Sequence, residues 1–280
     1  MKQFLNRHGL NITKYAFVNL MLVIVLFPIY WMLLSSFKTN NQLLTLPPEF
    51  IPSSVTLANY IEILGTPKYL IYYKNSLIVT SITVVLTIII SILAGYSFSR
   101  YTFKGKKVAM LLVLSVQMFP LVAILISLYT FYAKLHLLNT FTGLILTDIT
   151  LSLPFAIWFL WAYFNTVPRS LDEAAYIDGC SRMRTLFTII VPLVKPGLLS
   201  VAIYTTLKTW DDFLFSLVII TRDAMRTLPV GIAVSFLGEY VHNYVGMMTV
   251  SVAASAPLVI LFILLQKNMV SGLTTGSVKG

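Results

Sequence analysis

The stretch SLIVTSITVVLTIIISILAGYSF, residues 76–98, determines the fold class of this protein. It contains no charged side chain. A helix needs roughly 20 mostly apolar residues to cross a hydrocarbon core of about 30 Å. Only helices and closed barrels satisfy their backbone hydrogen bonds inside a bilayer. The stretch therefore predicts a helix that spans a membrane.

Similar apolar stretches recur along the 280-residue chain, separated by polar segments. They cover residues 15–34, 108–131, 143–163, 197–220 and 247–265. The composition is 58% hydrophobic and only 11% charged, whereas soluble domains carry roughly 25% charged residues. The sequence excludes a soluble fold and predicts an all-α polytopic membrane protein with about six transmembrane helices, forming a single domain over residues 1–280.

The net charge of +10 follows the distribution expected of a membrane protein. If the amino terminus is inside, 13 of the 20 Lys and Arg residues lie in cytoplasmic segments, and only Lys208 remains for the membrane. Short cytoplasmic loops accumulate such residues, so both termini are expected to be cytoplasmic. A nucleic-acid partner would call for a basic stripe interleaved with aromatic residues, and the sequence contains none. The first apolar run exceeds the 7–15 residues typical of a signal peptide, so we expect an uncleaved span.

The polar segment at about residues 165–196, between the fourth and fifth spans, predicts two short helices. Ser170 and Glu173 stand at the spacing of a capping box, which starts a helix. Gly179 suits the left-handed position that ends one. Ser181 is a candidate second N-cap, and apolar residues then recur at helical spacing up to an expected stop at Pro192. A compact protrusion on the cytoplasmic face is the result.

This segment resembles a known motif. The run EAAYIDG at residues 173–179, followed by Ile189 and Pro192, is similar to the EAA motif of permease subunits in binding-protein-dependent ABC importers. Further resemblance lies in WDDFLF at residues 210–215, TLPVG at residues 227–231 and the tail at residues 265–280. Nearly the whole chain thus resembles the carbohydrate-uptake branch, near its smaller maltose-transporter permease. Cys180 and the pair Asp211 and Asp212 depart from the usual pattern of the family.

The resemblance implies the type I ABC importer permease fold, with residues 165–196 as a coupling loop that docks on a cytoplasmic ATPase. The residues assigned to this coupling are Glu173, Ala174, Ala175, Asp178 and Gly179. A simpler interpretation is that Glu173 only closes the capping box and Gly179 only ends the helix. The two roles can coexist.

The resemblance also implies a set of partners in a bacterial plasma (inner) membrane. They are a second permease subunit, two ATP-binding subunits, an extracytoplasmic solute-binding protein and membrane lipid. This chain has no G-x-x-x-x-G-K-[ST] phosphate loop, so ATP and Mg²⁺ are expected on the partner ATPase. The chain shows no nucleophile elbow or metal-ligand cluster, which predicts a transport subunit with no catalytic residues, cofactor or metal of its own.

Charged and aromatic residues near the fifth span are the candidate substrate path: Tyr204, Lys208, Trp210, Asp211 and Asp212. Ionisable residues in a membrane segment indicate a functional site. Lys208 precedes Asp212 by four residues, so one continuous helix would let them pair, and a salt bridge that orders the bundle is the alternative. Aromatic rings and hydrogen-bonding groups together suit a sugar.

The predicted function is therefore translocation of a sugar, an oligosaccharide being favoured, that a binding protein delivers and ATP hydrolysis drives. The alternatives are another polar solute, such as a sugar derivative, a uronate oligomer or glycerol phosphate, or a secondary carrier. A secondary carrier would show inverted repeats with broken helices at matching places, and the sequence shows none.

Overall fold

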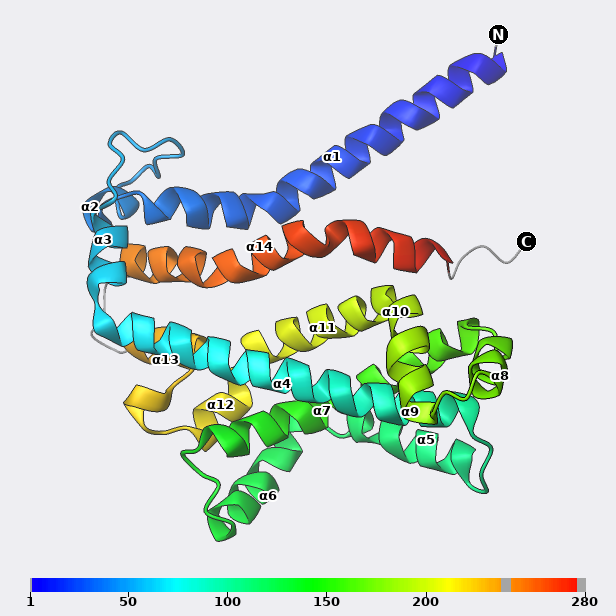
Figure 1. Ribbon diagram of the computed structural model, residues 1–280. Helices are drawn as coiled ribbons and strands as arrows, with labels where there is room; N and C mark the ends of the chain where they lie inside the picture. Colours follow the sequence, from blue (N-terminus) through cyan, green and yellow to red (C-terminus); the bar gives the residue numbers. More distant parts are fainter. Residues whose placement is uncertain (1, 238–242, 276–280) are drawn as a thin grey trace. The chain divides into compact units, whose positions relative to one another are not determined.

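The computed structural model describes residues 2–237 and 243–275. Within these ranges the secondary structure is helical, with no strand (Figure 1). The chain divides into two compact units, residues 1–67 with 232–256, and residues 68–231 with 257–280. We describe each unit by itself. The end of the predicted tail motif, residues 276–280, lies outside the described residues.

Four of the predicted spans form single long helices. They are α1 (Lys2–Ser36), α4 (Pro67–Arg100), α7 (Phe141–Thr166) and α14 (Tyr244–Thr275). The predicted span at residues 108–131 is a bent pair, in which Lys106–Met118 and Leu121–Lys134 meet at 98°. In the second bent pair Arg182–Leu193 and Lys195–Trp210 meet at 81°. Only the second helix of that pair falls in the predicted span 197–220, which resumes after a break as Leu214–Ile219. The prediction of about six spans is confirmed if each bent pair counts as one.

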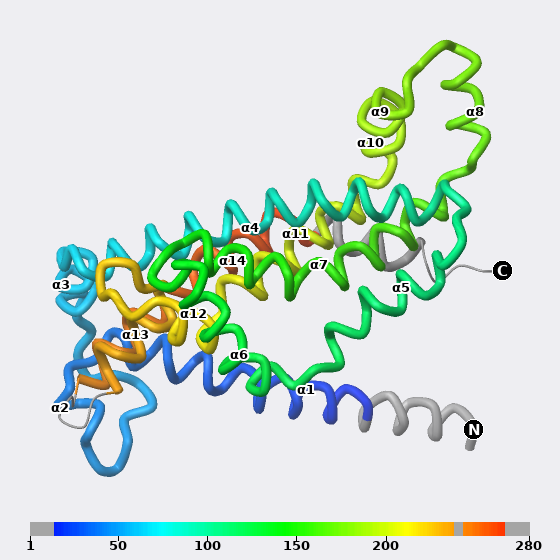
Figure 2. The backbone as a smooth tube through the Cα atoms, turned by 90° about the horizontal axis from the view of Figure 1, so that it is seen from below, coloured from blue at the N-terminus to red at the C-terminus, as the bar shows by residue number. Residues whose placement is uncertain are grey.

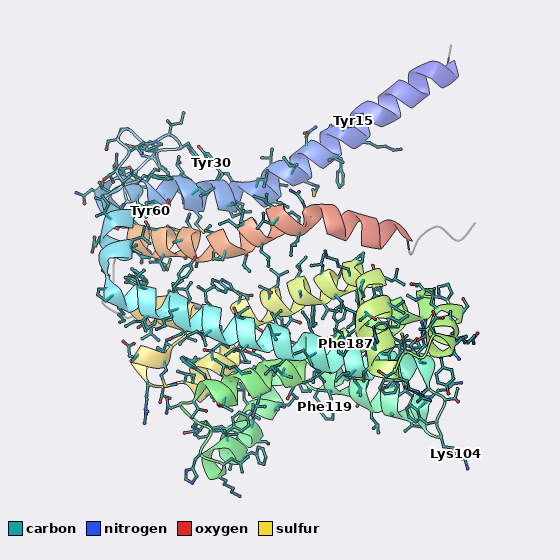
Figure 3. The ribbon with its side chains drawn as sticks, viewed as in Figure 1. Tyr15, Tyr30, Tyr60, Lys104, Phe119 and Phe187 are labelled. Atoms are coloured by element: carbon teal, nitrogen blue, oxygen red, sulfur yellow. The ribbon has the colours of Figure 1, made fainter. Side chains whose placement is uncertain are left out.

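The first bend has a local cause at Pro120. The helices involved are α5 (Lys106–Ser115), the single turn η1 (Val116–Met118) and α6 (Leu121–Lys134). A proline disfavours the helical conformation in the residue before it, and Phe119 is extended with φ −75° and ψ 134°. Figure 3 shows Phe119 at this junction. Pro28, Pro154 and Pro257 instead lie inside continuous helices.

The first unit is organised around the end of α1. It contains α2 (Asn40–Leu43), α3 (Ala58–Gly65), part of α13 (Leu228–Phe236) and the first part of α14. The carbonyl of Ser36 accepts hydrogen bonds from Asn59 at 3.3 Å and Thr249 at 3.2 Å, and its hydroxyl lies 2.7 Å from that of Tyr60.

The second unit is built around α7, the most buried of the four long spans. Helix α11 (Lys195–Trp210) packs along it. Two apolar clusters surround α7. One is centred on its C-terminal half, with Ala156, Leu160 and Phe164, and the other on its N-terminal half, with Leu144 and Ile149. In Figure 2 the segments α8 to α10 project to one side of α4, near its C-terminal end. The core of the unit therefore supports a loop near one end of its helices.

Candidate functional site

The projecting loop begins with α8 (Ser170–Ile177), but its start differs from the prediction. The N-cap position is Arg169, whose backbone is already helical, and no side chain caps the helix. The backbone N–H of Glu173 donates to the carbonyl of Arg169 at 3.1 Å. The predicted capping box between Ser170 and Glu173 is therefore wrong. The helix starts one residue early, so Ser170 lies inside the first turn and cannot cap it.

The end of α8 agrees with the prediction. Gly179 has φ +77°, a left-handed conformation that favours glycine. Its N–H donates to the carbonyl of Tyr176 at 3.1 Å, and the N–H of Cys180 donates to that of Ala175 at 2.9 Å. These two bonds form a Schellman motif, which satisfies carbonyls that the helix end leaves free. Gly179 therefore sets the direction in which the chain leaves α8.

The second helix of the loop starts as predicted and continues further. The hydroxyl of Ser181 accepts from the N–H of Arg184 at 3.3 Å, which caps α9 (Arg182–Thr185). A π-helical turn, η2 (Leu186–Ile190), and α10 (Val191–Leu193) follow. The helix ends at Leu193, one residue after the predicted stop at Pro192, and α11 follows at an angle of 81°.

Asp172 attaches α8 to the membrane helices. Its carboxylate lies 2.9 Å from Nε of Arg100, the last residue of α4, and accepts a hydrogen bond of 2.6 Å from the hydroxyl of Tyr96. The guanidinium of Arg100 also donates to the carbonyls of Phe164 and Val167, each at 3.1 Å. The side chains of Arg100 and Asp172 are only 8% and 20% exposed. This connection fixes α8 to the ends of α4 and α7.

The predicted coupling residues divide by exposure. Glu173, Ala174, Asp178 and Gly179 are exposed. Ala175 is only 3% exposed and packs within its own chain, so its side chain is not available to a partner.

Two apolar residues of the same helix, which the sequence reasoning did not assign, are largely exposed: Tyr176 at 76% and Ile177 at 84%. The sequence could have indicated this exposure, because a helix of two turns cannot bury two large apolar residues that are adjacent in the chain.

The candidate substrate path contains a second broken helix. Helix α11 ends at Trp210, with Asp211 at its C-cap. The carboxylate of Asp212 accepts hydrogen bonds from the N–H groups of Phe215 at 3.3 Å and Ser216 at 2.9 Å, which start α12 (Leu214–Ile219). In the described part of the chain no ion pair joins Lys208 to Asp212. The predicted pairing along one helix is wrong because the helix ends between the two residues.

Several of the candidate path residues nonetheless line connected space. Lys208, Asp211 and Asp212 line a cavity of about 270 Å³. Tyr204 lines a neighbouring cavity of about 200 Å³, which also has Lys208 in its wall. Trp210 is separate from this group. It is 6% exposed, packs edge-on against Tyr73 with ring centroids 5.7 Å apart, and lines a different cavity.

The 270 Å³ cavity contains one charged residue that the sequence reasoning missed. Asp148 lies in the N-terminal half of α7, is 4% exposed and lines this cavity together with Lys208, Asp211 and Asp212. Its Oδ2 atom has no hydrogen-bond partner among the described residues. The signal was available, because an acidic residue within the apolar run of residues 143–163 is costly in a membrane.

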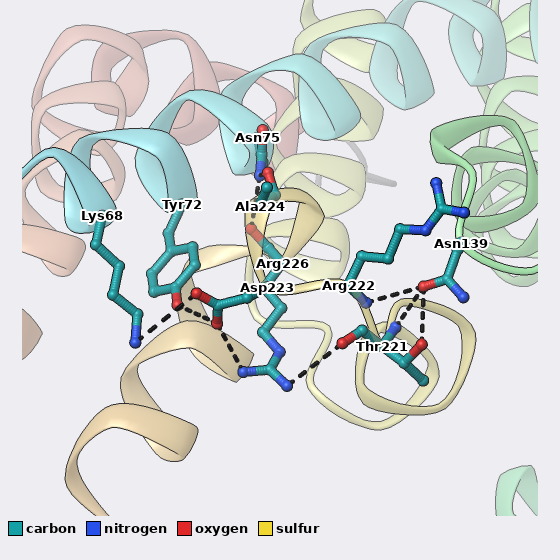
Figure 4. A network of polar contacts seen from close by, with 9 residues as sticks. All are labelled: Lys68, Tyr72, Asn75, Asn139, Thr221, Arg222, Asp223, Ala224 and Arg226. Atoms are coloured by element: carbon teal, nitrogen blue, oxygen red, sulfur yellow. Dashed lines mark hydrogen bonds and ion pairs between the residues drawn. The ribbon is translucent and has the colours of Figure 1, made fainter.

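The opposite end of α4 carries a second polar network (Figure 4). The hydroxyl of Tyr72 donates to Asp223 at 2.7 Å, and Lys68 and Arg226 lie 3.9 Å and 2.8 Å from the same carboxylate. The hydrogen bond from Tyr72 and, after it, the charges of Lys68 and Arg226 lower the pKa of Asp223. Asn75 donates to the carbonyl of Arg226 at 2.9 Å.

This second network involves the loop between α6 and α7 as well. The side-chain oxygen of Asn139 accepts from the N–H groups of Thr221 at 2.8 Å and Arg222 at 2.9 Å (Figure 4). The single turn η3 (Asp223–Met225) follows. The TLPVG segment at residues 227–231 then enters α13, where the N–H of Leu228 donates to Ser76 at 2.8 Å. Both ends of α4 therefore hold loops from other parts of the second unit.

The fold and the site define a class: a polytopic helical membrane protein with a rigid loop at one end of its spans and a charged cavity between them. Residues 87–275, more than half of the chain, match the family described as "Binding-protein-dependent transport system inner membrane component". The chain belongs to this family, a component of membrane transport systems. This confirms the prediction of a transport subunit in the inner membrane.

Relatives with known names are similar over most of their length. The chain is 41% identical to the trehalose/maltose transport system permease protein MalG of Thermococcus litoralis, covering 93% of this chain and 94% of that protein. It is 37% identical to the sulfoquinovosyl glycerol transport system permease protein SmoH of Agrobacterium fabrum, covering 95% and 93%. A bacterial ABC transporter that imports the acidic polysaccharide alginate matches with a TM-score of 0.80 at 18% identity, covering 92% and 95%. That last likeness concerns the fold alone.

Proposed function

We propose that this chain is a permease subunit of an ATP-driven importer that moves a saccharide across a bacterial inner membrane. The family supports the transport role. Two relatives that match more than nine tenths of the chain are permeases for trehalose and maltose and for sulfoquinovosyl glycerol. An extracytoplasmic binding protein delivers the saccharide, and a second permease subunit completes the membrane pathway. The alternatives that the sequence left open are another polar solute, such as a sugar derivative, a uronate oligomer or glycerol phosphate, and a secondary carrier.

The observation that best supports ATP-driven transport is the exposed face of α8. Tyr176 and Ile177 project from a helix that Asp172 and Arg100 fix to the membrane spans. Apolar side chains exposed on a rigid projection mark a surface that a partner covers. A rigid projecting loop can also transmit a rotation of the partner subunit to the membrane spans. We assign this face, with Glu173, Ala174, Asp178 and Gly179, to contact with the ATPase subunits, which bind ATP and Mg²⁺.

The experiment that tests this proposal replaces the exposed face of α8. Ile177→Glu places a charge where an apolar contact is expected. Leu171→Glu is the control on the same helix, because Leu171 is only 37% exposed, whereas Ile177 is 84% exposed. We expect Ile177→Glu to lose copurification of the ATPase subunits and saccharide uptake, while the variant still inserts into the membrane. Normal copurification with Ile177→Glu would exclude this face as the docking site, and uptake without any ATPase subunit would identify a secondary carrier.

The topology of the proposal can be tested with the single cysteine of the chain. Replacing Cys180 with alanine gives a cysteine-free background. A cysteine placed at Lys279 then reports the side of the C-terminus. We expect it to react with a membrane-impermeant thiol reagent only after the cells are opened. Labelling in intact cells would contradict a cytoplasmic C-terminus.

A further inference from the structure

The cavity beside Asp148 contains more carboxyl groups than basic groups. Asp148, Asp211 and Asp212 line it, and Lys208 is the one basic residue in its wall. The carboxylate of Asp212 is occupied, because it caps α12 through the N–H groups of Phe215 and Ser216. Lys208 can balance at most one of the other two. An excess of acceptor oxygens therefore faces the cavity.

Asp148 is the residue that indicates a ligand. It is 4% exposed and lines the cavity from the N-terminal half of α7. Its Oδ2 atom lacks a hydrogen-bond partner within the described ranges. Leaving a buried polar atom without a partner costs free energy, and ionisable residues inside membrane segments mark substrate pathways. A ligand that donates a hydrogen bond to Asp148 would remove this cost.

The remaining wall suits the apolar face of a sugar ring. The rest of the cavity wall is apolar and is formed by Leu121, Leu151, Leu207, Phe213, Leu214 and Phe215. The neighbouring cavity shares Leu121, Leu151 and Lys208 and adds the ring of Tyr204. A pyranose or furanose offers hydroxyl donors on its rim and C–H groups on its faces, which match this mixture of acceptors and apolar side chains. The two cavities share part of their walls, so together they offer space for a ligand larger than a single functional group.

The charge of the wall selects among saccharides. An anionic group needs hydrogen-bond donors, and Lys208 is the one basic side chain in this wall. The hydroxyl groups of an uncharged saccharide can donate to the acceptor oxygens of the wall. The comparisons leave the charge class open, because one similar fold imports an acidic polysaccharide and one relative transports trehalose and maltose.

We infer that Asp148 is a saccharide-binding residue, and that the cavity it shares with Lys208, Asp211 and Asp212 admits uncharged saccharides and excludes anionic ones. This inference rests on the proposed function and specifies its substrate class. The carboxylate of Asp148 accepts a hydrogen bond from a sugar hydroxyl. The surplus of Asp148 and Asp211 over Lys208 excludes uronate and sulfonate groups.

The first part of the test compares two sets of probes on the complete importer with its own binding protein. The neutral set contains gluco-, arabino-, galacto- and N-acetylchito-oligosaccharides, and the acidic set contains oligogalacturonates and alginate oligomers of matched length. We expect uptake of a member of the neutral set and none of the acidic set. Uptake of an acidic probe at a comparable rate would overturn the inference and leave the proposed function intact. Uptake of neither set would overturn the proposed function, and the inference with it.

The second part tests Asp148 with the neutral probe that is transported best. Asp148→Asn keeps the shape and an acceptor oxygen, whereas Asp148→Leu removes the acceptor. Loss of a hydrogen bond to a charged acceptor is expected to lower uptake by roughly 10-fold or more in Asp148→Leu, and Asp148→Asn is expected to keep most of it. Ser152→Ala, one turn further along α7 and fully buried outside the cavity, is the matched control with unchanged uptake.

A purely structural role for Asp148 makes different predictions. If Asp148 only neutralises Lys208, Asp148→Asn fails as badly as Asp148→Leu, and the double variant Asp148→Leu/Lys208→Met recovers uptake. Either result overturns the inference, as does normal uptake by Asp148→Leu. Copurification with the other subunits shows that each variant assembles. Asp148→Ala replaces Asp148→Leu if the latter does not assemble, with the same expected loss.

Discussion

Each end of α4 holds a loop through the same three kinds of side chain: tyrosine, arginine and aspartate. At the C-terminal end, Tyr96 and Arg100 contact Asp172 of α8. At the N-terminal end, Tyr72 contacts Asp223, which also lies beside Arg226. The surroundings differ. The Asp172 side chain is 20% exposed, and that of Asp223 is 54% exposed.

This difference in exposure changes what the same contact does. Exposed ion pairs contribute about 0–1 kcal/mol because water and salt screen them. Removing one partner of a buried pair costs about 3–5 kcal/mol, because the other charge is left without compensation. We therefore expect the contact at Asp172 to fix α8 rigidly and the contact at Asp223 to add little. A loop that transmits a motion needs the first kind of attachment.

The largest expected effect is at the glycine that directs the chain out of α8. Leucine in a left-handed conformation costs about 1–2 kcal/mol, and Gly179 has φ +77°. Nothing lies within 4 Å of an added Cβ there, so the strain is in the backbone alone. We expect Gly179→Leu to reduce saccharide uptake by at least ~10-fold, since 1.4 kcal/mol corresponds to a factor of ten.

Gly105 is the matched control for this prediction. It has φ +84°, has equally open surroundings and lies outside the coupling loop. Gly105→Leu carries the same backbone strain and is expected to keep near-normal uptake and ATPase association. Gly179→Asn should also keep most activity, because asparagine tolerates the left-handed region. Equal losses in Gly179→Leu and Gly105→Leu would show that strain, and not the direction of α8, causes the defect.

The largest effect on stability, as distinct from uptake, is expected at the buried attachment. Asp172→Asn leaves the guanidinium of Arg100 without its carboxylate partner, and a loss of about 3 kcal/mol is expected in the stability of the loop. Thermal unfolding of the detergent-solubilised complex and proteolysis of residues 165–196 measure it. Asp178→Asn, an exposed carboxylate of the same loop, is the control. Unchanged protease resistance in Asp172→Asn would contradict the rigid attachment.

The third prediction separates folding from docking at Glu173. The absent capping box means that Glu173→Ala removes no cap hydrogen bond. We expect the stability of the complex to change by less than about 0.5 kcal/mol, as for ordinary surface substitutions. A reduced yield of copurified ATPase then reports the interface directly. If Glu173→Ala lowers the thermal stability as much as Asp172→Asn does, the carboxylate has a structural role that this geometry does not show.

The smallest effect is expected at Asp223 and depends on pH. The hydrogen bond from Tyr72 and the charges of Lys68 and Arg226 lower its pKa below the usual 3.8. A lowered pKa means that the ionised carboxylate stabilises the folded state. Its contribution is therefore complete above about pH 4 and is lost as the pH falls through the lowered pKa.

Asp223→Asn tests that contribution. At pH 7 we expect a loss below about 1 kcal/mol, because the pair is exposed. The difference between Asp223→Asn and the unmodified protein should be smaller at about pH 3 than at pH 7 and should shrink at high salt. Thermal unfolding at the two pH values measures it. A difference that is independent of pH would assign the effect to packing rather than to charge.

Local sequence signals predicted much of this protein. The apolar runs indicated the long helices α1, α4, α7 and α14, because length and hydropathy alone determine whether a segment can span a bilayer. Gly179 and Ser181 marked a helix end and a helix start, because their roles depend on the conformation of a few neighbouring residues. The EAA motif and its spacing indicated the family, which the match over residues 87–275 confirms.

The tertiary structure determined what depends on residues far apart in the chain. Ala175 faces inward and Ile177 outward because α8 packs on one side only, and the partner of Asp172 is Arg100, distant in sequence. Lys208 and Asp212 do not pair because the helix ends between them. Asp148 joins their cavity from another helix. Periodicity reports one helix at a time, whereas a cavity and a buried ion pair arise only when several helices pack together.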